Sequence, residues 1–326
     1  MLKRIILSLF IINIIFLTNS CFKKPTDPFI GKGGNNGDSK KIPVNLSDDY
    51  TNNIYLKFSQ VNSQGIYVVV LNQDREALPA EYFISANFKV NYNGVVITSA
   101  ALIKETANTL GQSIATSLVL DYSDSMASEK DNLEIAAKTF VNNMQRRDRC
   151  EIIKFGSKVY VEQEYTSDRN LLLEAITGNT SANGSTALYD AIYKGVENTR
   201  LEVGQRAVIA FTDGEENKSE KYKNLEELMA AVREVGIPIY TIGLGTGIEK
   251  SALKAISLQT RGEEYYAQDA KELSDIYQKI SNIFINTMIL SWEDFNYTPG
   301  EKISLEANYF CENGSFSDSL EDITLY

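Results

Sequence analysis

The middle of the chain, from about residue 113 to 286, alternates short apolar segments with segments of helical periodicity, and this alternation constrains the fold most. The apolar segments read SIATSLVL, CEIIKF, RAVIAF and IPIYTIGL, each nearly continuous, as expected for strands covered on both faces. Helical segments with one apolar face run from about Ala127 to Arg147, Leu225 to Val232 and Lys271 to Ile285. This alternation predicts an α/β fold with a doubly wound, mostly parallel sheet, whose ligands bind beyond the carboxyl ends of the strands.

The two ends of the chain have a period-two pattern instead. From about Asn53 to Thr98 apolar and polar residues alternate, with Asn93-Gly94 as a candidate hairpin turn. The last segment alternates in the same way between Ile303 and Tyr309. Because a few strands alone bury too little apolar surface, we expect the N- and C-terminal strands to come together as one small sandwich-like β domain.

The N-terminal residues are typical of an export signal. Lys3 and Arg4 precede an apolar run of 13 residues, Ile5 to Leu17, and a short polar stretch. That run is shorter than the roughly 20 residues that a helix needs to cross a bilayer. Cys21 stands where a lipoprotein signal places the cysteine that becomes lipidated. We therefore expect a lipid anchor at Cys21, and the alternative is an ordinary secretory signal followed by an unrelated cysteine.

These patterns give a predicted organisation in five parts. A signal peptide covers residues 1–20, and a flexible tether rich in glycine, proline and lysine covers 21–44. The first part of the β domain covers 45–110, the α/β domain covers 111–287, and strands that complete the β domain cover 288–326. We expect the mature protein to be exported and held by its lipid at a bacterial membrane, at the cell surface or in the periplasm.

The composition excludes several classes of function. The net charge is −11, and removal of two positive charges with residues 1–20 makes it −13, so nucleic acid is not an expected partner. The chain has no histidine, which excludes serine or cysteine nucleophiles activated by histidine and histidine-ligated zinc. Any metal must therefore accept oxygen ligands. Cys150 and Cys311 could pair outside the cytoplasm, but two distant cysteines do not establish a disulfide.

Three loops at predicted strand ends carry oxygen-bearing side chains. The stretch DYSDS supplies Asp121, Ser123 and Ser125, GSTALYDA supplies Thr186 before a helix, and FTDGEEN supplies Asp213 after a strand. Alternate residues of an extended segment face the same way, so the first three oxygens can converge. Carboxylates and hydroxyls are ligands that Mg²⁺ accepts. Ordinary helix capping is the alternative for each loop alone, but capping does not require two carboxylates after adjacent strands.

The three motifs resemble the von Willebrand factor type A (VWA) family, whose metal-ion-dependent adhesion site is written Asp-x-Ser-x-Ser, then a distant Thr and a distant Asp. The resemblance covers about residues 113–286. It implies that Asp121, Ser123 and Ser125 hold a metal, that Thr186 joins directly or through water, and that Asp213 acts mainly through water. Family members often have Gly where this chain has Asp124, and Gly-Gly-Thr where it has Gly-Ser-Thr at 184–186.

The resemblance implies a surface-anchored, metal-dependent binding or adhesion module and not an enzyme. Its Mg²⁺, or Mn²⁺ or Ca²⁺, would accept an Asp or Glu carboxylate from a partner protein. In some relatives the last helix of the domain shifts when the metal gains a ligand, which is a further possibility here. One alternative is a Mg²⁺-dependent phosphohydrolase of the haloacid dehalogenase type, although Ser123 stands where that family has its acid–base aspartate. The other is a purely structural surface module in which the metal pins the loops.

Overall fold

The computed structural model describes residues 54–324 apart from 107–108, 179–183, 214–215, 246–247, 297, 299 and 312–313. The predicted signal peptide, the lipidation site at Cys21 and the tether therefore lie outside the described residues, and the predicted domain boundaries stay a prediction. No helix in the described part of the chain is long and apolar enough to cross a membrane.

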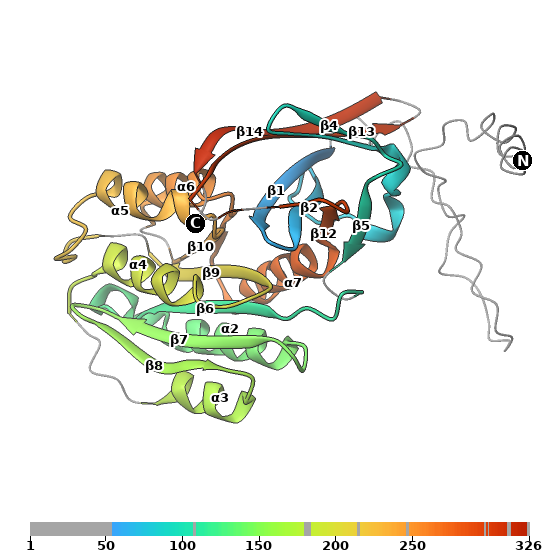
Figure 1. Ribbon diagram of the computed structural model, residues 1–326. Coiled ribbons are helices and arrows are strands. Elements are labelled where there is room, and N and C mark those ends of the chain that lie inside the picture. Colours follow the sequence, from blue (N-terminus) through green and yellow to red (C-terminus); the bar gives the residue numbers. More distant parts are fainter. Residues whose placement is uncertain are drawn as a thin grey trace, which may run out of the picture.

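A six-stranded sheet forms the centre of the molecule, with the strand order β11-β10-β9-β6-β7-β8 (Figure 1). Its strands are β6 (Ile114–Asp121), β7 (Arg149–Phe155), β8 (Val159–Thr166), β9 (Gln205–Thr212), β10 (Ile239–Leu244) and β11 (Glu264–Ala267). All neighbours are parallel except β7 and β8, which pair antiparallel. The predicted mostly parallel α/β sheet is confirmed. The two outer strands were not predicted, because β8 is half-buried without a continuous apolar run and β11 has only four residues.

Helices cover both faces of this sheet. One face packs against α2 (Lys130–Asn143), α3 (Arg169–Thr177) and α7 (Ala270–Asn286), and the other against α4 (Leu188–Thr199), α5 (Leu225–Val232) and α6 (Lys250–Gln259). The apolar stripe predicted for the first helix is confirmed, since Leu133, Phe140 and Val141 of α2 are buried against the sheet. Short 3₁₀ helices complete this part: η3 (Asp124–Ser128) and η4 (Arg233–Val235).

The predicted association of N- and C-terminal strands is also confirmed. One four-stranded sheet has the order β1-β2-β12-β5 and the other β14-β13-β3-β4, and all neighbours are antiparallel. The strands are β1 (Ile54–Asn62), β2 (Gly65–Asn72), β3 (Phe88–Tyr92), β4 (Val95–Ile97), β5 (Ile103–Thr106), β12 (Met288–Ser291), β13 (Lys302–Cys311) and β14 (Gly314–Thr324), with 3₁₀ helices η1 (Ala80–Tyr82) and η2 (Ser85–Asn87). The two sheets share one apolar core. Asn93 and Gly94 both have positive φ, as the predicted hairpin turn requires.

The small β domain sits against the amino ends of β9, β10 and β11. The side-chain amide of Gln60 donates to Gly204 O at 3.1 Å, and its carbonyl accepts from Arg206 N at 3.0 Å, both just before or within β9. The Lys57 ammonium contacts Glu263, which precedes β11. Strand β1 therefore crosses the amino edge of the central sheet from β9 to β11, and the carboxyl ends of the strands are left for the predicted site.

Candidate metal centre

Asp121 ends strand β6 and is almost completely buried, with 1% of its surface exposed. Its Oδ1 accepts a hydrogen bond from Ser123 N at 2.9 Å, and its Oδ2 accepts one from Thr212 Oγ1 at 2.6 Å, at the end of neighbouring β9. Burial raises the pKa of the Asp121 carboxyl to about 6, although the bonds from Ser123 and Thr212 act in the opposite direction. The negative charge of Asp213, which follows Thr212 in the sequence, raises this pKa further.

The two serine hydroxyls converge as the alternating spacing predicted. Ser123 is buried and extended, Ser125 is exposed, and their Oγ atoms are 3.1 Å apart. Ser123 occupies the N-cap position of η3, but its side chain makes no capping hydrogen bond. The capping alternative therefore does not account for the Ser123 hydroxyl, which instead faces the exposed hydroxyl of Ser125.

Thr186 lies on the second loop, two residues before α4, and is buried. Its N–H donates to Asn217 Oδ1 at 2.9 Å, and its carbonyl accepts from Asn217 N and Lys218 N, both at 3.1 Å. These bonds join the Thr186 loop to the loop that follows β9 and Asp213. The N-cap of α4 is Ala187, without a side-chain cap, so Thr186 is not a capping residue either.

Asp124 ties the first loop to the second. Asp124 N donates to Gly184 O and Gly184 N donates to Asp124 Oδ1, both at 2.9 Å. Gly184 has φ +77°, and a Cβ there would lie 2.6 Å from Ser157 Oγ, so glycine is required for this close approach. The aspartate that departs from the family motif thus bonds to the loop that carries Thr186.

Sequence analysis missed the groups that shape the third loop. The Glu216 carboxylate accepts from Tyr189 N at 2.9 Å and from Ser219 N at 2.7 Å, so it joins the third loop to the start of α4. Asp190 similarly accepts from the backbone N–H groups of residues 220 to 222. Acidic side chains next to a polar loop often accept hydrogen bonds from its backbone N–H groups. This pattern could have identified Glu216 and Asp190 in the sequence.

The family can be assigned from the sequence comparisons. The model of the von Willebrand factor type A domain matches residues 117–279, which is half of the chain and includes all three loops. The chain belongs to the von Willebrand factor type A family. No curated protein sequence matches it.

Solved structures similar to the VWA protein include several bacterial proteins. BatB from Bacteroides thetaiotaomicron is 20% identical with a TM-score of 0.46, over 52% of this chain and 98% of that chain. A von Willebrand factor type A protein from Catenulispora acidiphila is 11% identical with a TM-score of 0.49, over 84% and 73%. Proximal thread matrix protein 1 from the mussel byssus, with a zinc-occupied MIDAS motif, is 23% identical with a TM-score of 0.46, over 60% and 50%.

The donor set of the VWA site fits a hard divalent cation. Asp121, Ser123 and Ser125 lie together, and the loops of Thr186 and Asp213 are bonded to them or to each other. Among the described residues no group of three or more histidine, cysteine, aspartate or glutamate side chains is placed to hold a metal. Two carboxylates and three hydroxyls are what Mg²⁺ or Mn²⁺ accepts.

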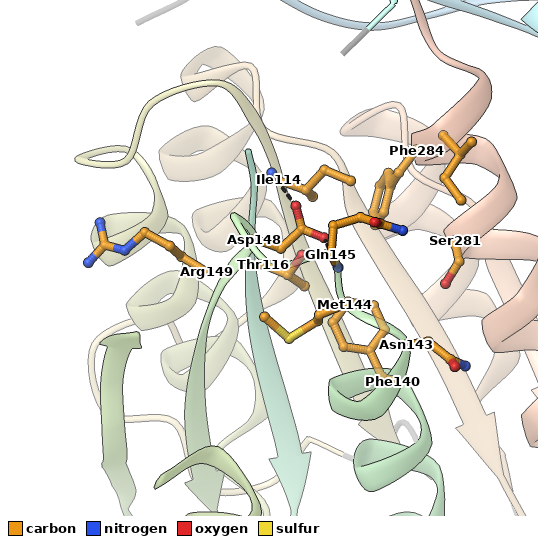
Figure 2. Close-up of a pocket in the computed structure, with 11 residues that line it drawn as sticks. Ile114, Thr116, Phe140, Asn143, Met144, Gln145, Asp148, Arg149, Ser281 and Phe284 are labelled. Atoms are coloured by element: carbon orange, nitrogen blue, oxygen red, sulfur yellow. Dashed lines mark hydrogen bonds between the residues drawn. The ribbon is translucent and has the colours of Figure 1, made fainter. Parts of the chain in front are cut away.

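The pocket in Figure 2 lies at the opposite end of the VWA sheet and is not this site. It is lined by residues from the amino ends of β6 and β7, the end of α2 and α7. There Asp148 accepts from Ile114 N at 3.0 Å and from Gln145 N at 2.7 Å. Cys150 lies nearby, close to the start of β7. Its thiol is free and buried, and burial raises its pKa, so it is not a reactive thiolate.

Proposed function

We propose that the VWA domain is a metal-dependent protein-binding module that holds an Asp or Glu carboxylate of a partner protein. Mg²⁺ is the expected ion, with Mn²⁺ and Ca²⁺ as substitutes. The observation that carries the proposal is the pair of hydroxyls of Ser123 and Ser125 beside the buried Asp121 carboxylate, because Ser123 is not used for capping. A divalent cation beside these hydroxyls would offset the cost of burying the Asp121 charge.

The site residues would supply two kinds of ligand, charged and neutral oxygens. Asp121 and Asp213 would supply two negative charges, which match one divalent cation, and Ser123, Ser125 and Thr186 would supply neutral oxygens. When bound, the ion would supply a coordination position for a partner oxygen, a contact stronger and more directional than an exposed ion pair. Ser125 is exposed, whereas Asp121 and Thr186 are buried, so a partner would approach from the Ser125 side.

The same proposal places the protein outside the cytoplasm. The export signal at residues 1–20 and the lipidated cysteine at position 21 would hold it to a bacterial membrane, at the cell surface or in the periplasm. This part of the proposal rests on the sequence pattern. Mass spectrometry of the membrane fraction, read for a diacylglyceryl group on Cys21 and loss of residues 1–20, would test it.

Metal binding is tested by calorimetric titration of the full chain with Mg²⁺ and Mn²⁺. Asp121→Ala should remove binding, and Asp131→Ala, which changes an exposed aspartate on α2, is the matched control and should not. Equal binding by the wild type and Asp121→Ala would overturn the site. Phosphate release from an aryl phosphate that requires Asp121 would favour the phosphohydrolase alternative instead.

Partner binding is tested separately. Candidate partner material is captured on the full chain with Mg²⁺ or with chelator, and captured proteins are then tested individually. A specific partner should need both the metal and Asp121, and substitution of its contacting carboxylate should abolish capture. If Asp121→Ala lowers thermal stability but leaves every metal-dependent capture unchanged, the result favours a purely structural surface module in which the metal only pins the loops.

A further inference from the structure

The amino end of the central sheet carries an unusual concentration of arginine next to the small β domain, which bonds to Gly204 and Arg206 through Gln60. We define the basic end as the four loops 109–114, 145–149, 166–169 and 200–206, which lie at the amino ends of β6, β7 and β9 and at the end of antiparallel β8. They contain six of the ten arginines of the chain: Arg146, Arg147, Arg149, Arg169, Arg200 and Arg206. Three acidic residues, Asp148, Asp168 and Glu202, leave a net charge of +3 in a chain of net charge −11.

Hydrogen bonds and an ion pair join three of these loops, and in the fourth the Arg169 guanidinium donates to Met144 O, next to the loop 145–149. The Arg147 guanidinium donates to Gly111 O at 2.7 Å, and the Arg149 guanidinium pairs with Glu202. Gln205 N donates to Ser113 O at 3.3 Å, which closes the connection between the first and last loops. All the arginines except the half-buried Arg206 are exposed. In Figure 2 the Arg149 side chain points away from the pocket beneath it.

The basic end also exposes large aliphatic side chains. Leu201 and Val203 are each 77% exposed, more than any other large apolar residue in the described part of the chain. A groove of about 510 Å³ opens at the basic end between the loops 109–114 and 145–149 and the end of α7. Arg146 and Arg147 line the groove together with the apolar residues Leu110, Phe284 and Ile285. Its wall is therefore partly charged and partly apolar.

We infer that the basic end docks onto an anionic lipid surface. Arginines attract anionic headgroups, and each basic residue near such a surface strengthens binding about fivefold at physiological salt. Exposed aliphatic side chains enter the boundary between headgroups and acyl chains, as in proteins that lie on membranes. A polyanion without acyl chains, such as nucleic acid, would bind the arginines but would not bury Leu201 and Val203. A lipid surface accounts for both the arginines and the exposed aliphatic side chains.

The position of the basic end agrees with docking onto a lipid surface. The candidate metal centre lies at the other end of the same strands, and β6 with eight residues separates the two by about 26 Å. A bilayer at the amino end would therefore leave Ser125 and its neighbours facing outward. The 33 residues from Cys21 to Asn53 precede β1 and are long enough to connect a lipid at Cys21 to either end. The docking surface itself rests on the described residues, whether or not Cys21 is lipidated.

The test is hydrogen exchange of the full chain on vesicles, read locally because the N-terminal apolar run could insert by itself. Vesicles of phosphatidylcholine alone are compared with vesicles that contain 30% phosphatidylglycerol, at low and at high salt. We expect slower exchange in residues 145–149 and 200–206, by at least about threefold, only on the anionic vesicles and only at low salt. No slowing, or equal slowing on neutral vesicles, would overturn the inference.

Variants separate the two contributions. The doubly substituted Leu201→Asp and Val203→Asp chain and the doubly substituted Arg146→Glu and Arg200→Glu chain should each lose the protection. Leu258→Asp on α6, where the side chain is 69% exposed, and Arg233→Glu on η4 are matched controls and should keep it. If soluble heparin protects the loops and the aspartate variants behave like the wild type, the surface binds polyanions and the lipid assignment is wrong.

Discussion

The two ends of the VWA sheet are built from the same six strands and differ in almost every other respect. At the carboxyl end the strands finish in Asp121 and Thr212, and three polar loops bond to one another around a buried carboxylate. At the amino end, half of the edge is covered by the small β domain through ion pairs and backbone contacts, and the other half exposes arginines and aliphatic side chains. Under the two proposals above, one sheet would hold partner recognition at its carboxyl end and attachment at its amino end.

The largest expected effect comes from the covered half of the amino end. A Cβ at Gly262 would lie 1.8 Å from Ile239 O, a backbone atom of β10 that cannot move without displacing the strand. Gly262→Ala should lower the free energy of unfolding by about 4 kcal/mol or prevent folding. Gly94→Ala, at a hairpin turn with φ +80° and nothing within 4 Å, should cost only about 1 kcal/mol. Denaturant unfolding measures both, and similar losses would show that Gly262 does not approach the backbone of β10 this closely.

A buried carboxylate near the amino end should respond to pH, and no metal is expected to compensate it. Burial raises the pKa of Glu151 to about 7, although hydrogen bonds from Ser117 and from Asn198, which donates to its Oε2 at 2.8 Å, act in the opposite direction. The folded state therefore binds this proton more tightly than the unfolded state, so stability falls as pH rises from about 4.5 to 7 and stays low above that.

Glu151→Gln removes this titration. At pH 8 it should raise the free energy of unfolding by about 2 kcal/mol, and near pH 4 it should change little. Thermal unfolding from pH 4 to 8 tests the sign directly. A variant that is less stable than the wild type at pH 8 would show that the ionised carboxylate is needed, and the proposed difference between the two ends would lose one of its supports.

The bond between Asp124 and Gly184 should have a smaller effect at the carboxyl end. Asp124→Ala removes the acceptor of Gly184 N and should weaken Mg²⁺ binding about three- to tenfold, at a cost of about 1 kcal/mol in stability. Asp124→Asn keeps a carbonyl oxygen at the same position and should bind nearly as tightly as the wild type. Calorimetry on the two variants distinguishes loop positioning from charge. If Asp124→Asn loses as much Mg²⁺ affinity as Asp124→Ala, the contribution of Asp124 comes from its charge.

Helix α7 should give the smallest response. It runs through Thr287 into β12, which pairs with β2 and β5, and Thr287 Oγ1 donates to Ile283 O at 2.7 Å. A shift of α7 by one turn, about 5 Å, would break both strand pairings. We therefore expect Mg²⁺ to change hydrogen exchange in the three site loops but not in residues 271–291. Faster exchange in those residues on metal addition would revive the switching possibility.

The sequence was informative about the central sheet because fully covered strands read as continuous apolar runs. It also predicted the five site residues at strand ends; the structure brings Asp121, Ser123 and Ser125 together, whereas Thr186 lies between α3 and α4. The outer strands were not predicted because β8 is half-buried without a continuous apolar run and β11 has only four residues. The loop contacts of Glu216 and Asp190 depend on backbone positions that no periodicity encodes.

The basic end could not be predicted from the sequence because its arginines come from separate loops. Arg146, Arg147 and Arg149 are close in sequence, but Arg169, Arg200 and Arg206 join them only when the ends of β7, β8 and β9 are brought to one edge. The overall charge of −11 also masks a local charge of the opposite sign. A net charge limits the partners of the whole surface only when the charges are evenly spread.

The central claim is that one hard cation binds at the carboxyl end of the VWA sheet. Anomalous diffraction from crystals of the full chain soaked in Mn²⁺ tests this claim most directly. We expect one strong peak with the Ser123 and Ser125 hydroxyls and Asp121 around it, within about 2.0 to 2.3 Å for direct ligands, and no such peak in Asp121→Ala crystals. A wild-type map without density there, or with manganese bound only elsewhere, would contradict the account.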